Sequence, residues 1–254
     1  MATRRHRAAV IPARFASTRF PGKPLALLAG KPMVVHVLER VHAAALFDTV
    51  CVATDDARIA AAVGAAGGEA RLTSMAHRTG TERVAEVAAA FPSDAWVYNV
   101  QGDEPLLPPA LLGELVRFVE SQPQVEMATA AHPSTVVEDF HAPQVVKVVT
   151  DAAGKALYFS RAPLPHDDGG ETTFLHHIGL YAFQRQTLLR FVSLAPGPLE
   201  RRENLEQLRA LEHGIPIHVL VTAHATRGVD TPADLKAVAT RLQPSLESPG
   251  VPHI

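Results

Sequence analysis

The stretch KPMVVHVLERVHAAALFDTVCVATD, residues 31–55, places an amphipathic helix directly before an apolar strand. The apolar residues of its first half recur with the 3.6-residue period of one helical face, and they are Val34, Val37, Leu38, Val41 and Ala45. A second apolar run, RAAVIPA at residues 7–13, precedes this stretch. The order strand, helix, strand predicts a parallel β-α-β unit with a right-handed crossover.

The same alternation continues along the chain to about residue 133. Further helices are predicted at 56–67, 81–91 and 108–122, and further strands at 69–74, from 95 onward, and at 125–133. Several of these strands are almost wholly apolar, as expected when helices cover both faces of a sheet. The fold class is therefore predicted to be α/β, with a mostly parallel, Rossmann-like sheet.

The middle of the chain follows a different pattern. Residues 144–165 contain two β-like runs around DAAGK, which predicts a hairpin. We predict that residues 131–197 form an inserted β-rich subdomain with mixed or antiparallel strands, within one domain spanning residues 1–254. A helix at 198–214, a strand at 215–223 and a helix at 231–242 complete the pattern, the last with a capping box of Thr231 and Asp234.

Composition narrows the classes of partner and compartment. The 254 residues include 24 Lys plus Arg and 26 Asp plus Glu. Because there is no excess of positive charge, the composition does not predict a nucleic-acid partner. Cys51 is the single cysteine, which excludes an intrachain disulfide framework and fits a reducing cytosol. No stretch approaches the roughly 20 apolar residues of a membrane span. We expect a cytoplasmic protein with no membrane partner.

The loop after the first strand gathers cations around small residues. In VIPARFASTRFPGKPLALLAGKPM, residues 10–33, Arg14, Arg19 and Lys23 alternate with small residues such as Ala13 and Ser17. Backbone N–H groups of such a loop form a cradle for an anion, and arginine and lysine neutralise phosphate oxygens. The spacing is neither that of a Walker loop nor that of a dinucleotide fingerprint. The alternative is a solvated loop with incidental charges.

Two acidic stretches follow other predicted strands. In YNVQGDEP, Asp103 and Glu104 lie where the carboxyl end of a strand would place a ligand site, and in GVDTPADL Asp230 precedes a helix. Such carboxylates suit Mg²⁺, which usually takes one or two carboxylates together with phosphates and waters. Gln101 has both donor and acceptor groups, as needed to read a base edge. The alternatives are an ordinary turn for the first stretch and a helix cap for Asp230.

Taken together, these motifs resemble those of the 3-deoxy-manno-octulosonate cytidylyltransferase family, the CMP-Kdo synthetases of lipopolysaccharide assembly. The resemblance runs from about residue 8 to 242, in the family's order and spacing. It is carried by IPARFASTRFPGKPLALLAGKPMVVHVLERV, VATDD, TGTERVAEV, NVQGDEPLLP, VVKVVTDAAGKALYFSRAPLP, HIGLYAF, LEQLR and GVDTPADL. It implies a nucleotidyltransferase fold in which the inserted β-rich region joins two subunits as a homodimer.

The resemblance also implies an activity and the residues that carry it. The anomeric hydroxyl of Kdo would attack the α-phosphorus of CTP, and pyrophosphate would leave. Arg14, Arg19 and Lys23 would bind the triphosphate with Ser17 and the backbone at Ala13, and Arg14, Lys23 and Asp103 would be catalytic. Asp103 and Asp230 would hold Mg²⁺. Gln101, Arg78 and the turn Thr79–Thr81 would lie near the cytosine or the sugar.

For the sugar acid, the resemblance implies Arg161, His177, Tyr181, Glu206 and Gln207. Taken by themselves, Glu206 and Gln207 could instead lie on a solvated helix face. Two departures from the family's pattern concern this region: His176 stands where the family often has arginine, and the segment HDDGGETT at 166–173 lacks an expected aromatic residue and arginine. They leave a related sugar acid, of the 8-amino-Kdo or sialic acid type, as an alternative substrate. A non-catalytic nucleotide-binding protein is a weaker alternative, because Lys23, Asp103 and Asp230 are all present.

Overall fold

The computed structural model of the 254-residue chain describes residues 4–16, 20–166, 169, 172–226 and 228–242. Ser17 and Arg19, which the sequence places in the anion cradle, therefore lie outside the described residues. None of the helices in the described part of the chain has the length and apolar character that a membrane crossing requires.

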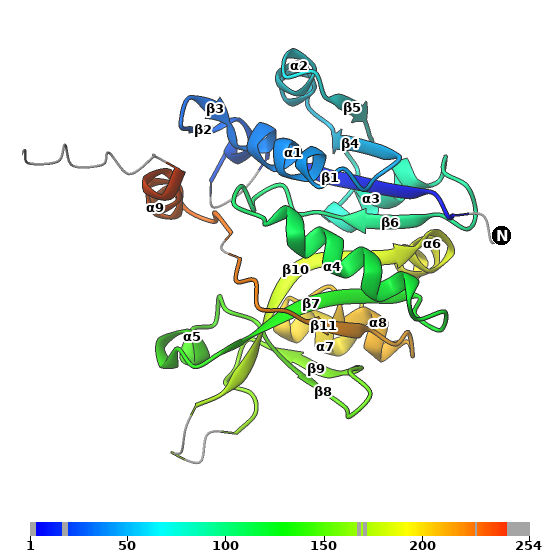
Figure 1. Ribbon diagram of the computed structural model, residues 1–254, viewed down its shortest axis with the longest axis vertical. Helices are drawn as coiled ribbons and strands as arrows, with labels where there is room; N and C mark the ends of the chain where they lie inside the picture. Colours follow the sequence, from blue (N-terminus) through cyan, green and yellow to red (C-terminus); the bar gives the residue numbers. More distant parts are fainter. Residues whose placement is uncertain (1–3, 17–19, 167–168, 170–171, 227, 243–254) are drawn as a thin grey trace, which may run out of the picture.

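A twisted, mostly parallel sheet forms the centre of the molecule (Figure 1). Its strands run in the order β11-β7-β10-β6-β1-β4-β5. The bounds are β1 Arg7–Ala13, β4 Thr49–Thr54, β5 Glu69–Leu72, β6 Trp96–Asn99, β7 Met127–Ser134, β10 Phe174–Gln184 and β11 His218–Val221. Among these strands β10 alone runs against the others, antiparallel to both β6 and β7.

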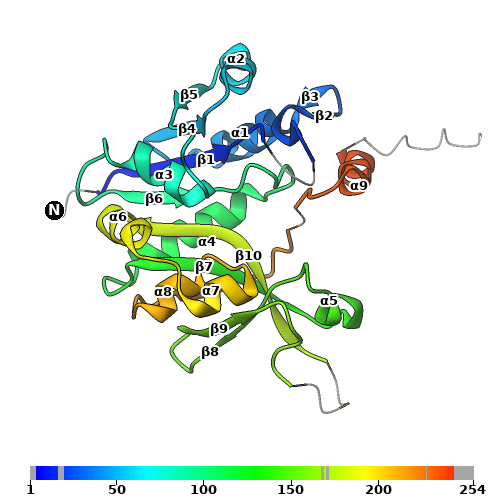
Figure 2. The same cartoon turned by 180° about the vertical axis from the view of Figure 1, so that it is seen from behind.

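Helices cover both faces of the sheet, as the apolar strands predict. Helices α1 (Met33–Ala43), α2 (Ala57–Ala65) and α4 (Pro109–Glu120) pack on one face, and α3 (Gly80–Ala88) and α6 (Arg185–Ser193) pack on the other. Figure 1 shows α1 and α4 in front of the sheet, and Figure 2 shows α3 and α6 in front of it. The fold class predicted from the sequence is confirmed.

The two faces of each strand feed different apolar clusters. In β1, Ala9 and Ile11 pack under α1 and α4, whereas Ala8 and Val10 pack under α3 and α6. This alternation is the two-residue period of a strand, and because both sets are apolar the strand reads as one continuous apolar run. Burial on both faces therefore explains the composition of RAAVIPA.

The predicted hairpin at 144–165 is present. Strands β8 (Lys147–Thr150) and β9 (Ala156–Ser160) pair antiparallel around the DAAGK turn, and β8 also pairs with β10. Helix α5 (Val137–His141) packs at the start of β10, where the Phe140 and Phe174 rings lie 5.3 Å apart. Within the range 131–197, however, β10 and part of β7 lie in the main sheet. The assignment of this range to a subdomain stays a prediction.

The helix predicted at 198–214 is interrupted, which corrects the sequence-based expectation. The structure has α7 (Pro198–Glu203) and α8 (Leu208–Glu212), separated at Asn204, whose φ of 52° is left-handed. Asparagine tolerates this conformation better than most residues. The break places Glu206 and Gln207 in a connection and not on a solvated helix face. The remaining described elements are β2 (Leu27–Leu28), β3 (Lys31–Pro32), a 3₁₀ turn at Lys23–Leu25 and α9 (Pro232–Leu242).

Candidate active site

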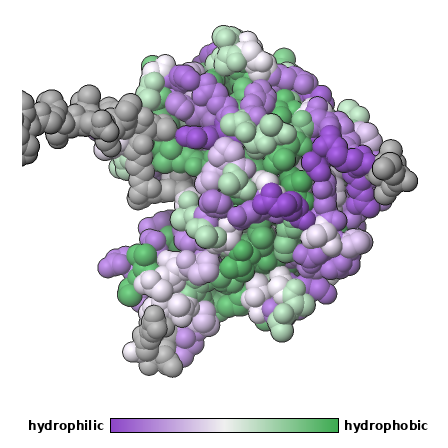
Figure 3. Space-filling view, viewed as in Figure 1, coloured by the Kyte–Doolittle hydropathy of each residue, from purple (hydrophilic) through white to green (hydrophobic). Residues whose placement is uncertain are grey.

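Three charged side chains from distant parts of the chain meet at the carboxyl edge of the parallel strands. The Lys23 Nζ atom donates to Asp103 Oδ2 at 2.6 Å and to the Val229 carbonyl at 2.9 Å, and it lies 3.5 Å from Asp230 Oδ1. The Val229 N–H also donates to the Asp103 carbonyl at 2.8 Å. The predicted convergence of the cationic loop with the two acidic stretches is thus present in the structure. At this edge the face drawn in Figure 3 is hollowed, above the lobe that carries α5.

Local contacts fix the ends of the cationic loop. The Gly22 N–H donates to the Phe15 carbonyl at 3.0 Å, and Gly22 has the left-handed φ of 72° that glycine adopts without strain. The Arg58 guanidinium lies 3.6 Å from the centroid of the Phe15 ring, a cation–π contact. Lys23 follows Gly22 directly, so these contacts help to hold its ammonium group against the carboxylates.

Gly102 allows the loop after β6 to approach the end of β1. A Cβ atom at this position would lie 2.8 Å from the Pro12 carbonyl oxygen, closer than real Cβ contacts permit. Glycine therefore brings Asp103, the next residue, against the loop that carries Lys23. This close approach is the backbone reason for the QGDE pattern.

A polar cavity, called here the first cavity, surrounds the lysine and carboxylate groups. It takes in most of the positions that the sequence assigns to the triphosphate and metal. Its lining residues are Pro12, Ala13, Arg14, Lys23, Pro24, Thr79, Gly80, Arg83, Gln101, Gly102, Asp103 and Asp230. Thr79 also caps α3, because its Oγ1 atom accepts from the Glu82 N–H at 3.1 Å.

Arg83 is a residue of this cavity that sequence reasoning missed. Its side chain is only 2% exposed and donates to Asp55 at 2.7 Å. It also donates to Thr73 and to the Ser74 carbonyl. The sequence signal was a charged residue on the apolar face of an amphipathic helix, where an unpaired charge would be very costly. The ion pair therefore fixes α3 against the end of β4.

A second cavity adjoins the first and shares Gln101 with it. Its wall is mainly apolar, with a few polar groups from α3, β10 and the connection between α7 and α8. Its lining residues are Thr81, Gln101, Met127, Val146, His177, Gly179, Tyr181, Phe183, Phe191, Leu205, Glu206 and Gln207. Four residues that the resemblance assigns to the sugar acid, His177, Tyr181, Glu206 and Gln207, thus lie around one space.

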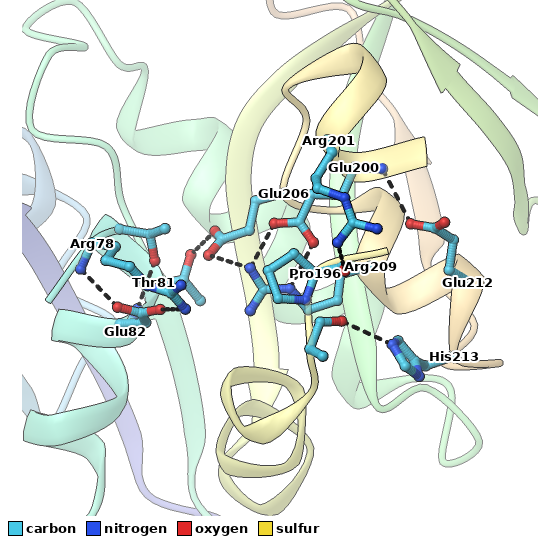
Figure 4. Close-up of polar contacts among 12 residues, drawn as sticks. Arg78, Thr81, Glu82, Pro196, Glu200, Arg201, Glu206, Arg209, Glu212 and His213 are labelled. Atoms are coloured by element: carbon cyan, nitrogen blue, oxygen red, sulfur yellow. Dashed lines mark hydrogen bonds and ion pairs between the residues drawn. The ribbon is translucent and has the colours of Figure 1, made fainter. Parts of the chain in front are cut away.

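A chain of hydrogen bonds links the two cavities. Gln101 Nε2 donates to Asn99 Oδ1 at 3.4 Å, and Asn99 Nδ2 donates to Thr81 Oγ1 at 3.3 Å. Thr81 in turn donates to Glu206 Oε2, across the gap between α3 and the α7–α8 connection (Figure 4). The sequence placed Thr81 in the turn expected near the cytosine or the sugar, whereas Asn99 was missed, although it stands out as an amide in an otherwise apolar strand.

Behind Glu206, a buried ion pair anchors the α7–α8 segment. Arg209, 2% exposed, donates to both carboxylate oxygens of Glu200 at 2.8 and 2.6 Å, and it lies 3.9 Å from Glu206 Oε1 (Figure 4). Its guanidinium also lies 5.1 Å from the centroid of Phe191, which lines the second cavity. The wall of this cavity therefore depends on Arg209 as well as on the residues that line it.

Burial changes the protonation of several groups here. Burial raises the pKa of Glu206, against the hydrogen bonds from Thr81 that lower it. Burial, and then the neighbouring His176, lower the pKa of His177 to about 3, so its ring is neutral near pH 7. Burial, and then the charge of Asp103, raise the pKa of Glu104 to about 7. The second cavity thus presents polar groups with little positive charge.

Two of the sequence-assigned residues lie outside both cavity linings. Arg161 donates to the backbone carbonyls of Glu203, Pro143 and Asn204 at 2.8, 2.9 and 3.3 Å, which ties the end of β9 to the α7–α8 connection. The Arg78 side chain is 70% exposed and pairs with Glu82 at 3.0 Å. Its carbonyl accepts from Arg14 at 3.4 Å. A role for either side chain in substrate binding stays a prediction.

The donor set at Lys23 fits a hard divalent cation. The carboxylates of Asp103 and Asp230 already converge on a cation, the Lys23 ammonium group. Oxygen donors of this kind suit Mg²⁺, which takes one or two carboxylates and completes its shell with phosphates and waters. Within the described residues no group of three or more His, Cys, Asp or Glu side chains could hold a metal.

The sequence and fold match known cytidylyltransferases. A family model described as Cytidylyltransferase matches residues 8–217. A 3-deoxy-manno-octulosonate cytidylyltransferase of Geobacter sulfurreducens is 50% identical over 247 residues, covering 92% of this chain and 98% of that protein. A protein of the same name from an Anaeromyxobacter species is 55% identical over 231 residues, covering 90% of this chain and 93% of its own length.

Solved structures agree with these relatives. A CMP:2-keto-3-deoxy-manno-octonic acid synthetase complexed with CTP superposes with a TM-score of 0.88 at 41% identity, covering 93% of this chain and 98% of that one. HddC from Yersinia pseudotuberculosis, complexed with GMP-PN, superposes with a TM-score of 0.67 at 13% identity over 93% of this chain and 99% of its own. The second likeness shows a shared fold alone.

Proposed function

The chain belongs to the 3-deoxy-manno-octulosonate cytidylyltransferases, within the wider cytidylyltransferase family, and we infer that it activates Kdo with CTP. The products are CMP-Kdo and pyrophosphate, and CMP-Kdo serves lipopolysaccharide biosynthesis. The names of the relatives favour Kdo over the related sugar acids that the sequence left open. His176 and the different 166–173 segment are then variations within the family.

The observation that carries this proposal is the adjacency of two chemically different cavities. The first gathers Lys23, Asp103 and Asp230 at the edge where α/β sheets bind ligands. The second, which shares Gln101, has neutral and acidic hydrogen-bonding groups on a largely apolar wall. A triphosphate in the first and a sugar acid in the second would place the anomeric hydroxyl beside the α-phosphorus.

In the proposed reaction this chain acts mainly by positioning and by neutralising charge. The oxygen of the sugar's anomeric hydroxyl forms a bond to the α-phosphorus and releases its proton, while the bond from that phosphorus to the oxygen that bridges to the β-phosphate breaks and pyrophosphate leaves. Arg14, Arg19 and Lys23 bind the triphosphate and stabilise the departing pyrophosphate, with Ser17 and the backbone at Ala13 assisting. Gln101, Arg78 and Thr79 lie near the cytosine or the sugar in this proposal.

We propose Mg²⁺ as the cofactor, with Asp103 and Asp230 as its protein ligands. A magnesium ion in such sites lowers the pKa of the attacking hydroxyl and neutralises phosphate charge. In the second cavity His177, Tyr181, Glu206 and Gln207 bind hydroxyl groups of the sugar, and Arg161 is proposed to assist with its carboxylate.

Two broader parts of the proposal concern assembly and location. We propose a homodimer formed through the β-rich region at 131–197, where the outer side chain of Leu157 on β9 is 62% exposed. An exposed leucine on a short strand is compatible with burial against a second copy. We propose the cytoplasm as the location, because the single Cys51 is a buried free thiol that suits a reducing compartment.

Pyrophosphate release tests the reaction directly. The protein would be supplied with CTP, Mg²⁺ and, in separate assays, Kdo, 8-amino-Kdo or N-acetylneuraminate. We expect rapid release with Kdo; release with another acid alone would transfer the proposal to that substrate, and release with none would overturn it.

A matched pair of variants tests the metal ligand. Asp103→Asn should abolish turnover while leaving the fold intact, because it removes a charge from the proposed metal site. Asp94→Asn, at an exposed position before β6, is the control and should retain activity. A fully active Asp103→Asn protein would remove Asp103 from the mechanism.

A further inference from the structure

The hydroxyl of Thr129 lies at an unusual junction between two strands. Thr129 is fully buried in the middle of β7. Opposite it, the pairing of β10 with β7 shifts register between Ile178 and Tyr181, which is a β-bulge. The bulge turns two backbone carbonyls toward the same hydroxyl, at 3.1 Å from Ile178 and 2.9 Å from Leu180. The ring of His177 completes the junction, with Nε2 at 3.0 Å from the Thr129 oxygen.

The chemistry of these groups favours one arrangement of protons. A hydroxyl has one hydrogen and two lone pairs, whereas a carbonyl oxygen only accepts. If the Thr129 hydrogen pointed to the histidine, both carbonyls would face an oxygen lone pair in a buried site, which is costly. The hydrogen must therefore point to a carbonyl, and the Thr129 oxygen must accept from an N–H at Nε2.

We propose that Thr129 is a positioning residue that fixes His177 as the Nε2–H tautomer. The other ring nitrogen, Nδ1, then carries a lone pair. Both hydrogen-bond contacts of the ring within the described part of the chain involve Nε2, one with Thr129 and one with the Tyr181 hydroxyl at 3.1 Å. Nδ1 is thus the ring nitrogen that remains as an acceptor, on a residue that lines the second cavity. The ring stays neutral near pH 7 because burial disfavours its charged form.

The tautomer also determines how Tyr181 behaves. Since Nε2 carries the hydrogen, the Tyr181 oxygen faces it as an acceptor, and the phenolic hydrogen can point to Thr129 or to a ligand. The two residues, which both line the cavity, therefore carry a ring-nitrogen acceptor and a phenolic hydroxyl, with no charge. Such a pair matches a hydroxyl group of a sugar, which both donates and accepts. This reading of the ligand rests on the proposed function of the second cavity, whereas the tautomer itself does not.

Nuclear magnetic resonance of the ring nitrogens tests the tautomer without any substrate. Protein labelled with ¹⁵N-histidine would be measured near pH 7, and His177→Gln would identify the signals of this ring by their loss. We expect a protonated Nε2 and an unprotonated Nδ1 in the unaltered protein. In Thr129→Val this preference should be lost, and in Thr129→Ser, which keeps the hydroxyl, it should be retained. A protonated Nδ1 in the unaltered protein, or an unchanged tautomer in Thr129→Val, would overturn the proposal.

Kinetics supply the second readout, with a control. Thr129→Val should raise the KM for the sugar acid about tenfold, since a cavity acceptor is lost, while the KM for CTP changes less than about twofold. Thr129→Ser should restore the sugar KM to within about threefold of the starting value. Thr187→Val removes another largely buried threonine hydroxyl, on α6, and should change neither KM.

If Thr129→Val fails to fold, the spectrum of the unaltered protein still decides. The expected tautomer without turnover on any sugar acid would overturn the proposed function alone.

Discussion

Removing the Arg209 guanidinium should destabilise the protein strongly. Arg209 and Glu200 are 2% and 12% exposed, and two charge-assisted hydrogen bonds of 2.8 and 2.6 Å join them. Arg209→Met keeps much of the side-chain volume but leaves the Glu200 carboxylate buried without its partner. Breaking a buried pair in this way costs about 3–5 kcal/mol. For a chain of this size, that loss lowers Tm by roughly 10 °C.

Equilibrium unfolding in urea would measure this loss, with three further variants for comparison. Arg190→Met removes an exposed arginine of α6 and should change the free energy of unfolding little. Glu200→Gln and the double variant complete a double-mutant cycle, in which we expect a coupling of at least about 1 kcal/mol. A loss below about 1 kcal/mol in Arg209→Met would refute the reasoning, because it would show that the carboxylate finds water or another partner.

Three other substitutions or conditions test separate features. Gly102→Ala should lower kcat/KM, measured by pyrophosphate release, about tenfold or more, because the added Cβ would lie 2.8 Å from the Pro12 carbonyl oxygen. An unchanged kcat/KM would show that this loop adjusts freely. Glu212→Ala removes a carboxylate that accepts from two N–H groups of the first turn of α7, at 2.8 and 3.1 Å. It should lower the free energy of unfolding in urea by about 1 kcal/mol, and an unchanged midpoint would refute the capping role of Glu212. Burial lowers the pKa of His176 to about 4 and that of His177 to about 3, so between those values and 6.5 the unfolded chain binds more protons than the folded protein. The free energy of unfolding should therefore fall as pH falls below 6.5, by up to about 1.4 kcal/mol per pH unit for each ring. The fall should be less steep in His176→Gln, and equal slopes in the two proteins would count against the assignment.

Periodicity was sufficient to predict the sheet and its covering helices. The pattern of residues 31–55 is typical of a helix followed by a buried strand, and that of residues 95–122 is typical of a buried strand followed by a helix, as β6 and α4 show. Patterns of this kind depend on local burial, which a sequence records directly. The interruption at Asn204 was not predicted, because the apolar spacing continues across it and a single left-handed residue leaves no periodic signal.

The site divides in the same way. Lys23, Asp103 and Asp230 could be placed at one edge because each follows a strand of a parallel sheet, and topology then brings them together. The role of Thr129 could not be predicted, and Thr81 was placed only within the turn expected near the cytosine or the sugar, because a threonine in a helix turn or in an apolar strand is common. Their roles arise from tertiary contacts, a register shift in one case and a bond across two helical segments in the other.

The reversed strand β10 also has a consequence for the order of assembly. It lies between β6 and β7, although its residues, Phe174–Gln184, follow both in the chain. As the polypeptide leaves the ribosome, the strands β1, β4, β5 and β6 can pair among themselves by short connections, whereas β6 and β7 each keep an open edge until β10 arrives. Long-range pairing of this kind is slow and leaves edges exposed to other chains. The half of the sheet built from β1, β4, β5 and β6 can therefore form during synthesis, but the wall that bears His177 and Tyr181 closes only after β10 has been made, and Asp230 completes the first cavity later still.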